Sequence, residues 1–400
     1  MLELEEARRR ILEIIPVLPS ESIFVSQADG RILAENIISA IDLPPFDNSA
    51  VDGYALQSND LKSATPENLI AVQVVGKIPA GESLSTKVES GQCIRIFTGS
   101  PLPDGADAVV MQEDTQHNSP SGYVSISCSV KPWENIRFRG EDIKNGVMIA
   151  QSGLRLRPAH LSLLGAIGQK NVRVGRQPVV ALLATGSELR EAGQTISGGA
   201  IFESNRIGLA ALAKRNGALP EMFPLIGDDV DQTKSALEKA FAECDVVVTT
   251  GGVSVGELDF VKAAFEKLGG KLEFWKISMK PGKPFVFGKL GEKFLFGLPG
   301  NPVSAFVTFV LLVAPALLRM QGASNVAPRI YLGVLAETFV NPGQRRHFVR
   351  VSADANGNVS SAGIQASHIL SSLANANGLV EIPPQTTLIA GATVSILSLE

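Results

Sequence analysis

The chain has 400 residues, a formal net charge of −4 at pH 7, 45% hydrophobic residues and 19% charged residues. This length exceeds one typical domain, and the composition excludes a largely disordered chain. No long basic run is present, so nucleic-acid binding is not expected. Cys93, Cys128 and Cys244 form no CxxC pair, which argues against a disulfide framework or zinc knuckle and favours reduced thiols in a cytoplasmic protein.

The first segment, residues 1–15, mixes acids and arginines with apolar residues at helical spacing. We expect an amphipathic helix that packs on the surface rather than a signal peptide. The most apolar segment, residues 306–318, is shorter than the roughly 20 residues that cross a bilayer. It is predicted to be a buried helix, and no membrane partner is expected.

A loop rich in short polar side chains follows the first strands. Residues 44–55 read PPFDNSAVDGYA, with two prolines before Asp47, Asn48, Ser49 and Asp52. These residue types form turns first and binding loops second, so a plain turn and a ligand loop both remain open.

Residues 69–149 have the pattern of an all-β module, in which short β-branched runs are separated by turns that contain Gly or Pro. The segments 98–103 and 135–142 place a hydroxyl beside a glycine and arginines beside acids. A hairpin turn and a surface ion pair are the alternatives to a functional role. Since residues 153–168 return to a helical pattern, the β module is predicted to be an insertion.

From residue 177 the pattern is α/β. Residues 179–185 and 245–250 are predicted to be buried parallel strands, because both runs are apolar without alternation. Gly251 and Gly252 follow the second strand, where a sharp turn would let a phosphate approach the backbone. An ordinary turn between strand and helix is the alternative.

Carboxylates follow three successive predicted strands, the second of which is placed at residues 223–229. They are Glu188, Asp228 and Asp259. Strand carboxyl ends converge on one crevice in such folds, so these acids are expected to lie together. A hard cation such as Mg²⁺ would relieve their repulsion and bridge to phosphate.

Residues 280–304 contain a second candidate site, which is expected to bind an oxyanion. Lys280 and Lys283 lie on a turn stiffened by prolines, and Asn301 and Pro302 are predicted to begin a buried helix. The helix terminus, the lysines and Ser304 would attract an anion, whereas a solvated turn and a plain cap are the alternatives. From residue 327 alternating strands predict a small β-barrel or sandwich.

Read together, the motifs resemble the molybdopterin molybdenumtransferase (MoeA) family, which includes the gephyrin E domain. The resemblance spans the chain and is carried, in order, by PPFDNSAVDGYA at 44–55, TGSPLPDGADAVV at 98–110, RGEDI at 139–143, TTGGVSVG at 249–256, MKPGKP at 279–284 and LPGNPVS at 298–304.

The resemblance implies an enzyme that converts adenylylated molybdopterin and molybdate, with Mg²⁺, into molybdenum cofactor and AMP. It implies a central MogA-like parallel α/β domain that binds the nucleotide, an inserted all-β domain and a C-terminal small β-barrel. The expected domains are 1–45 with 150–176, 46–149, 177–325 and 326–400. A homodimer with its active site between subunits is also implied, as are possible adenylyltransferase and molybdoenzyme partners.

Residue by residue, the resemblance assigns three sets. The catalytic set is Asp52, Thr98, Glu188, Asp228 and Asp259, of which the last three are also the expected metal ligands. The cofactor-binding set is Gly251, Gly252, Ser254, Ser204 and Asn205. The molybdate-binding set is Lys280, Lys283, Ser304, Arg345 and Ser372, with the adjacent Arg346 and Ser371 as alternatives.

Two positions depart from the family pattern. Val51 stands where Met is more frequent, and Glu203 stands where Asp is more frequent, so Glu203 is not assigned as a ligand. Adenylyltransfer onto molybdopterin and a non-enzymatic gephyrin-like scaffold are the rival functions.

Overall fold

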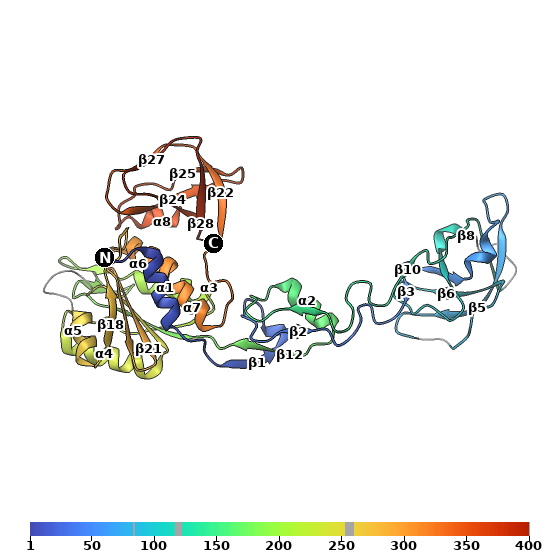
Figure 1. Ribbon diagram of the computed structural model, residues 1–400, viewed down its shortest axis with the longest axis horizontal. Coiled ribbons are helices and arrows are strands. Elements are labelled where there is room, and N and C mark those ends of the chain that lie inside the picture. The colour runs from blue at the N-terminus through green and yellow to red at the C-terminus, as the bar shows by residue number, and fades with distance from the viewer. Residues whose placement is uncertain (83–84, 117–121, 253–259, 400) are drawn as a thin grey trace. The chain divides into compact units, whose positions relative to one another are not determined.

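The computed structural model describes residues 1–82, 85–116, 122–252 and 260–399. The chain divides into two compact units (Figure 1). The first unit comprises residues 1–35, 152–157 and 171–400, and the second comprises residues 36–151 and 158–170. The finer division into four domains stays a prediction.

A six-stranded sheet forms the centre of the first unit. Its strands, in spatial order, are β16 (Leu219–Met222), β13 (Val179–Ala184), β17 (Val246–Thr250), β21 (Lys293–Leu298), β20 (Val286–Leu290) and β18 (Lys271–Trp275). The first four strands are mutually parallel, while β20 and β18 pair antiparallel at one edge. The carboxyl ends of the parallel strands therefore lie at one edge of the sheet.

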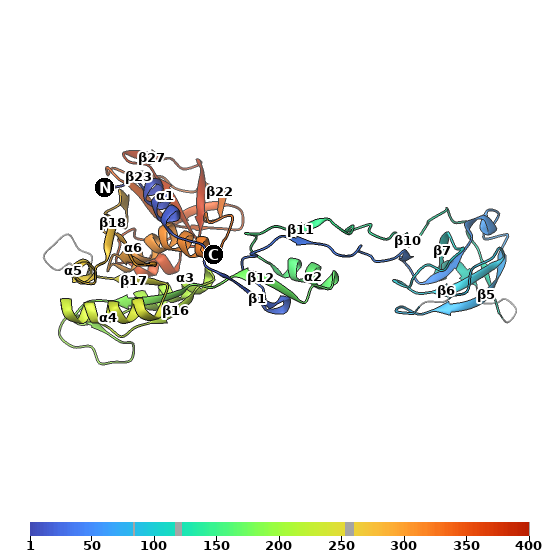
Figure 2. The same cartoon turned by 60° about the horizontal axis from the view of Figure 1, so that its bottom comes forward.

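Helices cover both faces of this sheet (Figure 2). One face carries α1 (Leu4–Ile14), α3 (Asn205–Arg215), α6 (Pro302–Thr308) and α7 (Ala314–Met320), and the other carries α4 (Val230–Glu243) and α5 (Phe260–Lys267). Because side chains alternate along a strand, Val180 and Leu182 pack on the first face and Ala181 and Leu183 on the second. Burial on both faces explains why these strands are apolar without alternation.

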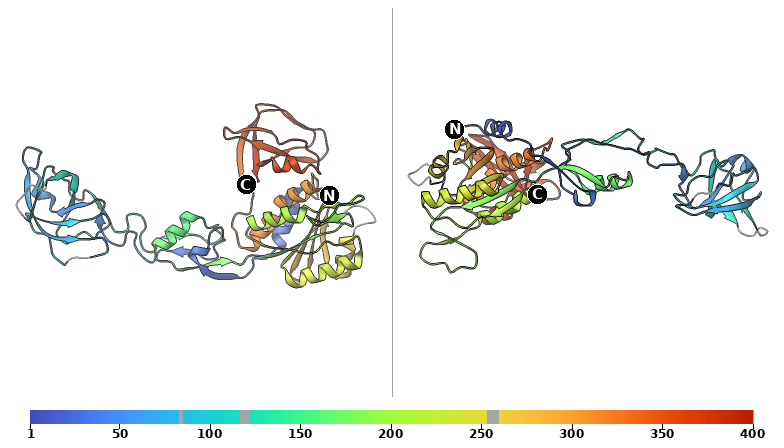
Figure 3. Two further views of the ribbon diagram at one scale, coloured as in Figure 1. Left: turned by 180° about the vertical axis from the view of Figure 1, so that it is seen from behind. Right: turned by 90° about the horizontal axis from the view of Figure 1, so that it is seen from below.

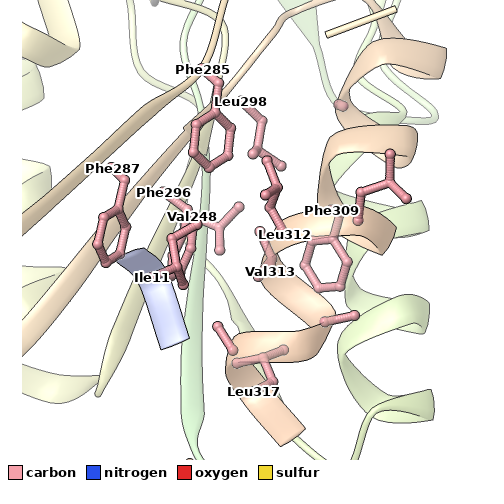
Figure 4. Close-up of a cluster of buried hydrophobic side chains, with 14 of the residues drawn as sticks. Ile11, Val248, Phe285, Phe287, Phe296, Leu298, Phe309, Leu312, Val313 and Leu317 are labelled. Carbon is pink, nitrogen blue, oxygen red and sulfur yellow. The ribbon is translucent and has the colours of Figure 1, made fainter. Parts of the chain in front are cut away.

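The larger core cluster lies between the sheet and α1, α6 and α7 (Figure 4). Phe285 before β20, Phe287 of β20 and Phe296 of β21 belong to one cluster with Phe309 and Leu312 of the helical segment. The helical segment Pro302–Met320 is long and apolar enough to cross a membrane, but 78% of its most apolar stretch is buried inside the protein. The apolar composition of this segment is therefore accounted for by core packing.

The C-terminal part of the first unit is a closed five-stranded barrel. Its strands are β24 (Arg346–Ala353), β25 (Asn358–Ser361), β22 (Ile330–Leu335), β28 (Thr393–Ser398) and β26 (Gly378–Ile382), and β26 pairs with β24 to close it. The short strand β19 (Met279–Lys280) pairs with β24, so the segment after β18 is attached to the barrel. The short helix α8 (Leu370–Ala374) lies on the side of the barrel that faces α6 (Figure 3).

Shorter elements complete the first unit. They are the ribbon β1 (Ser20–Phe24) with β12 (Asn171–Gly175), the pair β14 (Leu189–Arg190) with β15 (Ile201–Phe202), and the pair β23 (Phe339–Asn341) with β27 (Thr386–Leu388).

The second unit is built on another six-stranded sheet. Its order is β7 (Ala108–Met111), β4 (Gly53–Leu56), β6 (Gln92–Ile96), β5 (Ile70–Ile78), β9 (Tyr123–Ile126) and β8 (Thr115–Gln116). The unit also contains β2 (Ile37–Ile38) with β11 (Met148–Ala150), β3 (Asn48–Ser49) with β10 (Ile136–Arg137), and α2 (Pro158–Ala166). Gly53 is required in β4, because a Cβ atom there would lie 1.8 Å from the carbonyl oxygen of Val110.

These observations confirm the predicted fold class of a mostly parallel α/β sheet, an inserted all-β part and a C-terminal barrel. The strand predicted at residues 223–229 is wrong. Strand β16 ends at Met222, and beyond it only the isolated bridge from Ile226 to Thr185 continues the pairing among the described residues. Pro224 has no amide hydrogen for a ladder, which favours an irregular segment.

Candidate active site

The glycine turn after β17 meets the ends of the two neighbouring strands. A Cβ atom on Gly251 would lie 2.4 Å from the carbonyl oxygen of Thr185, and one on Gly300 would lie 3.5 Å from Gly251 Cα. Gly251 and Gly252 have φ angles of 82° and 63°, which favour glycine. The sequence predicted the turn, and the structure adds that it is packed tightly against the ends of β13 and β21.

Two buried hydroxyls lie at this edge without a partner. Within the described residues, Thr185 Oγ1 and Thr249 Oγ1 are buried and form no hydrogen bond. Thr185 Oγ1 would be 2.8 Å from a Cβ atom on Gly252. Buried polar atoms are normally satisfied, so unpaired hydroxyls beside a close-approach turn mark a place where a polar ligand can bind.

Asn205 also belongs to this edge of the sheet. Its side-chain Nδ2 donates to the Gly300 carbonyl oxygen at 2.8 Å. Ser204 occupies the N-cap position of α3 and is exposed, but it forms no capping hydrogen bond through its side chain. The hydrogen bond from Asn205 to Gly300 lies close to the glycine turn, and the assignment of Ser204 and Asn205 to cofactor binding stays a prediction.

Of the three predicted acidic residues, the structure describes Glu188 and Asp228. Asp228 accepts a hydrogen bond from the Ser187 amide at 3.0 Å, and its own amide donates to Ser187 Oγ at 3.1 Å. Glu188 is the next residue after Ser187, and its carboxylate lies near Gly186, where a Cβ atom would meet Oε2 at 2.6 Å. Both carboxylates are exposed at the same strand edge.

Asp259 and Ser254 lie outside the described residues. Among the residues that are described, no group of three or more His, Cys, Asp or Glu side chains could hold a metal ion. Glu188 and Asp228 nevertheless offer exposed hard oxygen atoms, the donor type that Mg²⁺ prefers. Their chemistry fits a partial ligand set.

Glu203 has a structural role. Its carboxylate accepts from the Arg206 amide at 2.8 Å and from Arg206 Nε at 2.9 Å, and both residues are buried. Arg206 also donates to Glu191 at 2.8 Å. A carboxylate that compensates a buried guanidinium is not free to bind a metal, which agrees with leaving Glu203 out of the ligand set.

The second candidate site lies where the α/β sheet meets the barrel. The α6 helix begins at Pro302 as predicted, with Asn301 at the N-cap position, although the Asn301 side chain forms no capping bond. Ser304 is buried in its first turn. The Val303 amide donates to the Ser367 carbonyl oxygen at 3.1 Å, which ties the helix terminus to the barrel segment before α8.

Lys280 ends the short strand β19 and Lys283 follows it, and the first of them lies beside the barrel. Lys280 is exposed and lies opposite His347 in the β19–β24 register. Lys283 is exposed two residues beyond Pro281, and its carbonyl oxygen accepts from the Ile277 amide at 3.1 Å. The tertiary structure thus brings Lys280 beside a strand that begins more than sixty residues later.

Arg345, just before β24, and Arg346, its first residue, differ in their partners. Arg346 forms ion pairs with Glu5 at 2.5 Å and with Glu381 at 3.3 Å. Arg345 donates to the Met279 carbonyl oxygen at 3.0 Å, and no ion pair to it is found in the described chain. Arg345 therefore keeps its charge available beside Lys280, whereas that of Arg346 is compensated.

Arg350 is a residue that the sequence interpretation missed. It is fully buried, and its Nε donates to Ser372 Oγ at 2.9 Å. Its Nη2 donates to the carbonyl oxygens of Ile364 at 2.8 Å and Ala366 at 3.2 Å. Over the described residues its Nη1 has no partner and no carboxylate forms an ion pair with the guanidinium.

A buried cation without a counter-ion is costly, and an anion bound at Nη1 would offset that cost. Ser372 is buried and bonded to Arg350, whereas Ser371 is exposed. An arginine within the apolar run from Phe348 to Val351 was the available sequence signal.

The neighbouring positive charges act on His347. Burial, followed by the charges of Lys280, Arg350 and Arg345, lowers the pKa of His347 from 6.5 to about 4. Its Nε2 is buried and has no partner in the part of the chain that is described. The imidazole is therefore neutral near pH 7 and adds no charge to the cluster.

Asp52 and Thr98 lie in the second unit. They meet where β4 begins and β6 has just ended, and Asp52 Oδ1 accepts from the Thr98 amide and hydroxyl, each at 2.8 Å. These two hydrogen bonds, helped by the charge of Arg95 and opposed by desolvation, lower the pKa of Asp52. The sequence placed them in separate motifs, and the sheet pairs them directly.

The chain matches family profiles along nearly all its length. Residues 2–168 match the MoeA N-terminal region (domain I and II), residues 181–319 match a probable molybdopterin binding domain, and residues 333–399 match the MoeA C-terminal region (domain IV).

Individual proteins are similar over the same extent. The chain is 38% identical to a molybdopterin molybdenumtransferase of Haemophilus influenzae, over 99% of this chain and 98% of the relative. It is 36% identical to molybdopterin molybdenumtransferase 2 of Mycobacterium tuberculosis, over 98% of each chain. A solved structure of the molybdopterin biosynthesis moeA protein from Pyrococcus horikoshii OT3 superposes with a TM-score of 0.85 at 34% identity, covering 99% of each chain.

Proposed function

Because this chain belongs to the MoeA family of molybdopterin molybdenumtransferases, we propose that its α/β sheet and barrel hold the two substrates of molybdenum insertion. It is a transferase that inserts molybdenum into molybdopterin. One observation supports the molybdate site above all. Arg350 is fully buried, and its Nη1 is unpaired among the described residues.

Molybdate binds in this proposal at the oxyanion pocket, which we define as Lys280, Lys283, Ser304, Arg345, Arg350 and Ser372. The buried guanidinium, the Ser304 region of α6 and the uncompensated Arg345 supply charge and hydrogen-bond donors. A tetrahedral dianion would satisfy the unpaired Arg350 Nη1, and charge-assisted hydrogen bonds of this kind are the strong ones. Lys280 and Lys283, which are exposed, would attract the anion from solvent.

The nucleotide half of adenylylated molybdopterin occupies the strand edge in this proposal. The tight turn at Gly251 and Gly252 leaves backbone accessible to phosphate, and the hydroxyls of Thr185 and Thr249 lack partners there among described residues. Glu188 and Asp228, with Asp259, would hold Mg²⁺. When bound, this ion would offset the negative charge of the pyrophosphate.

Catalysis would come from positioning and charge neutralisation rather than from a protein nucleophile. A molybdate oxygen attacks the phosphorus on the pterin side of the phosphoanhydride, the bond from that phosphorus to the AMP oxygen breaks, and AMP leaves. The dithiolene sulfur atoms of the pterin then bind molybdenum while its bond to the new phosphate oxygen breaks. That oxygen stays on the pterin phosphate, and a molybdenum oxo group leaves as water with the two thiol protons. Arg345 and Arg350 keep the dianion in place during this exchange, because their charges have no carboxylate partner in the described chain.

The exposed Asp52 and Thr98 of the second unit complete the site in this proposal, supplied by a second copy of the chain in a homodimer. The cysteines that the structure describes are free thiols, and we place the enzyme in the cytoplasm. Adenylyltransferase and molybdoenzyme partners would deliver substrate and accept product.

To test this function, purified protein is incubated with adenylylated molybdopterin, molybdate and Mg²⁺, and the release of AMP and the formation of molybdenum-loaded cofactor are measured. Release of AMP in step with molybdenum-loaded cofactor is expected. ATP consumption with unmodified molybdopterin would instead indicate adenylyltransfer, and absence of both reactions would favour the scaffold. The barrel and its buried arginine support insertion, because adenylyltransfer requires no molybdate pocket.

A further inference from the structure

A hollow with a volume of 640 Å³ opens on the sheet of the second unit. It is lined by the aromatic side chains of Tyr54 and Phe97, the cations Lys77 and Arg95, and residues 74–76. No acidic side chain lines it within the described residues. The function proposed above does not use this hollow.

The strand register explains why these side chains gather. Arg95 of β6 lies opposite Tyr54 of β4 and also opposite Lys77 of β5, so three neighbouring strands contribute one row. Phe97 follows Arg95 at a spacing of two and therefore projects from the same face. The cluster is thus fixed by the sheet rather than by loops.

The Arg95 guanidinium is held in a defined orientation. Its Cζ lies 4.9 Å from the ring centre of Tyr54 and 5.2 Å from that of Phe97. Nη1 donates to the Gly53 carbonyl oxygen at 3.2 Å, and Nη2 donates to the Gln112 side chain. An oriented, partly desolvated guanidinium is a stronger anion binder than one free in solvent.

Neither Lys77 nor Arg95 forms an ion pair in the described part of the second unit, although the charge of Arg95 acts on the nearby Asp52. Lys77 is exposed, with its Nζ 5.2 Å from the Phe97 ring centre. Two cations without an ion-pair partner, beside a hollow that no described acid lines, attract an anion. The hollow also adjoins the Asp52–Thr98 pair, because Gly53 and Phe97 are their chain neighbours.

We propose that Arg95 and Lys77 form a phosphate-binding subsite, which holds a phosphate ester of the substrate next to Asp52 and Thr98. The identity of that ester rests on the proposed function, in which both the nucleotide and the pterin carry phosphate. The charge and the geometry of the hollow do not depend on that function. Phosphate oxygens would accept hydrogen bonds from the guanidinium and the ammonium group.

The test measures amide hydrogen exchange of the full-length protein with AMP or with inorganic phosphate. Slower exchange is expected in peptides that cover residues 70–78 and 92–97. Equal protection by both ligands assigns the site to the phosphate group alone, and stronger protection by AMP assigns it to the nucleotide. Protection confined to residues 246–252, or none with either ligand, overturns the proposal.

Variants sharpen this test. Lys77→Ala is expected to weaken AMP binding at these peptides by about tenfold, the usual order for one charge-assisted contact, and more so at low salt. Lys62→Ala, an exposed lysine of the same unit, is the matched control and should bind as the wild type does. Unchanged binding by Lys77→Ala contradicts the proposal.

In the insertion assay Lys77→Ala should raise the KM for the adenylylated substrate about tenfold and leave kcat within about twofold. If the wild-type chain inserts no molybdenum, the proposed function fails, yet the exchange experiment still decides whether the hollow binds phosphate. Arg95→Lys keeps the charge but not the planar group, and it should show the same rise in KM because the guanidinium geometry is lost.

Discussion

Arg350 and Ser372 lie 22 residues apart in the chain, yet Nε of the arginine donates to the serine hydroxyl at 2.9 Å inside the protein. The hydroxyl in turn donates to the Ile369 carbonyl oxygen at 2.9 Å. Ser372 therefore orients the guanidinium, and Nη1 remains the unpaired donor among described residues. In the proposed oxyanion pocket, this guanidinium would form the buried end.

Arg350→Lys should weaken molybdate binding by at least about tenfold. The substitution replaces a planar guanidinium, which has several donors, with a shorter side chain that ends in one ammonium group. Equilibrium binding of molybdate to the purified chain measures the effect. Arg346→Lys is the matched control, since Arg346 is already paired with Glu5 and Glu381 and should retain binding. Equal affinities of the two variants would remove Arg350 from the pocket.

Gly251→Ala should abolish nucleotide-dependent activity and destabilise the protein. The alanine Cβ would lie 2.4 Å from the Thr185 carbonyl oxygen, in addition to the strain of a φ of 82°. Strain of this kind costs about 1–2 kcal/mol by itself, and the contact adds to it. Denaturant unfolding and AMP release measure the two effects.

Gly269→Ala separates strain from contact. Gly269 has a φ of 83°, and a Cβ atom added to it would have no neighbouring atom within 4 Å among the described residues. This variant should lose only about 1–2 kcal/mol of unfolding free energy and keep its activity. A loss equal to that of Gly251→Ala would show that the strand-edge contact is unimportant.

His347 should make stability depend on pH. Its pKa is about 4 in the folded chain and 6.5 ordinarily, so the unfolded state binds more protons between these values. Stability from this group is therefore present above pH 6.5 and falls as the pH drops toward 4. The expected loss between pH 7 and pH 4.5 is on the order of 2 kcal/mol.

Urea unfolding of the wild-type chain and of His347→Gln at both pH values tests this. The variant should show a smaller loss of unfolding free energy by about that amount. Saturating molybdate should also reduce the loss in the wild type, because an anion beside the imidazole raises its pKa. The same pH slope in both proteins would mean that His347 does not carry the effect.

The proposed homodimer, in which each active site uses residues of both chains, predicts complementation between inactive variants. Asp52→Asn and Lys280→Ala alter different units of the chain, and each variant alone should be nearly inactive. Mixed and reassembled together, they should recover on the order of a quarter of wild-type activity, since half of the dimers would contain one intact site of two. Lack of recovery, despite exchange of subunits, would place both residues in the site of one chain.

The sequence alone predicted much of the framework. Local periodicity predicted the buried strands β13 and β17, the amphipathic helix α1 and the start of α6 at Pro302, because these depend on residues close in the chain. The resemblance assigned candidate residues to both sites. The strand expected at residues 223–229 was wrong because a locally apolar run does not specify whether a neighbouring strand pairs with it.

Only the tertiary structure determined which polar groups meet and which are already satisfied. It pairs Glu203 with Arg206, compensates Arg346 with Glu5, and leaves Arg350 buried with an unpaired nitrogen within the described residues. These outcomes depend on contacts between residues far apart in the chain and on the desolvation that packing produces. A pattern of residue types in the sequence specifies neither these contacts nor the desolvation, since charge compensation is a property of the folded surroundings.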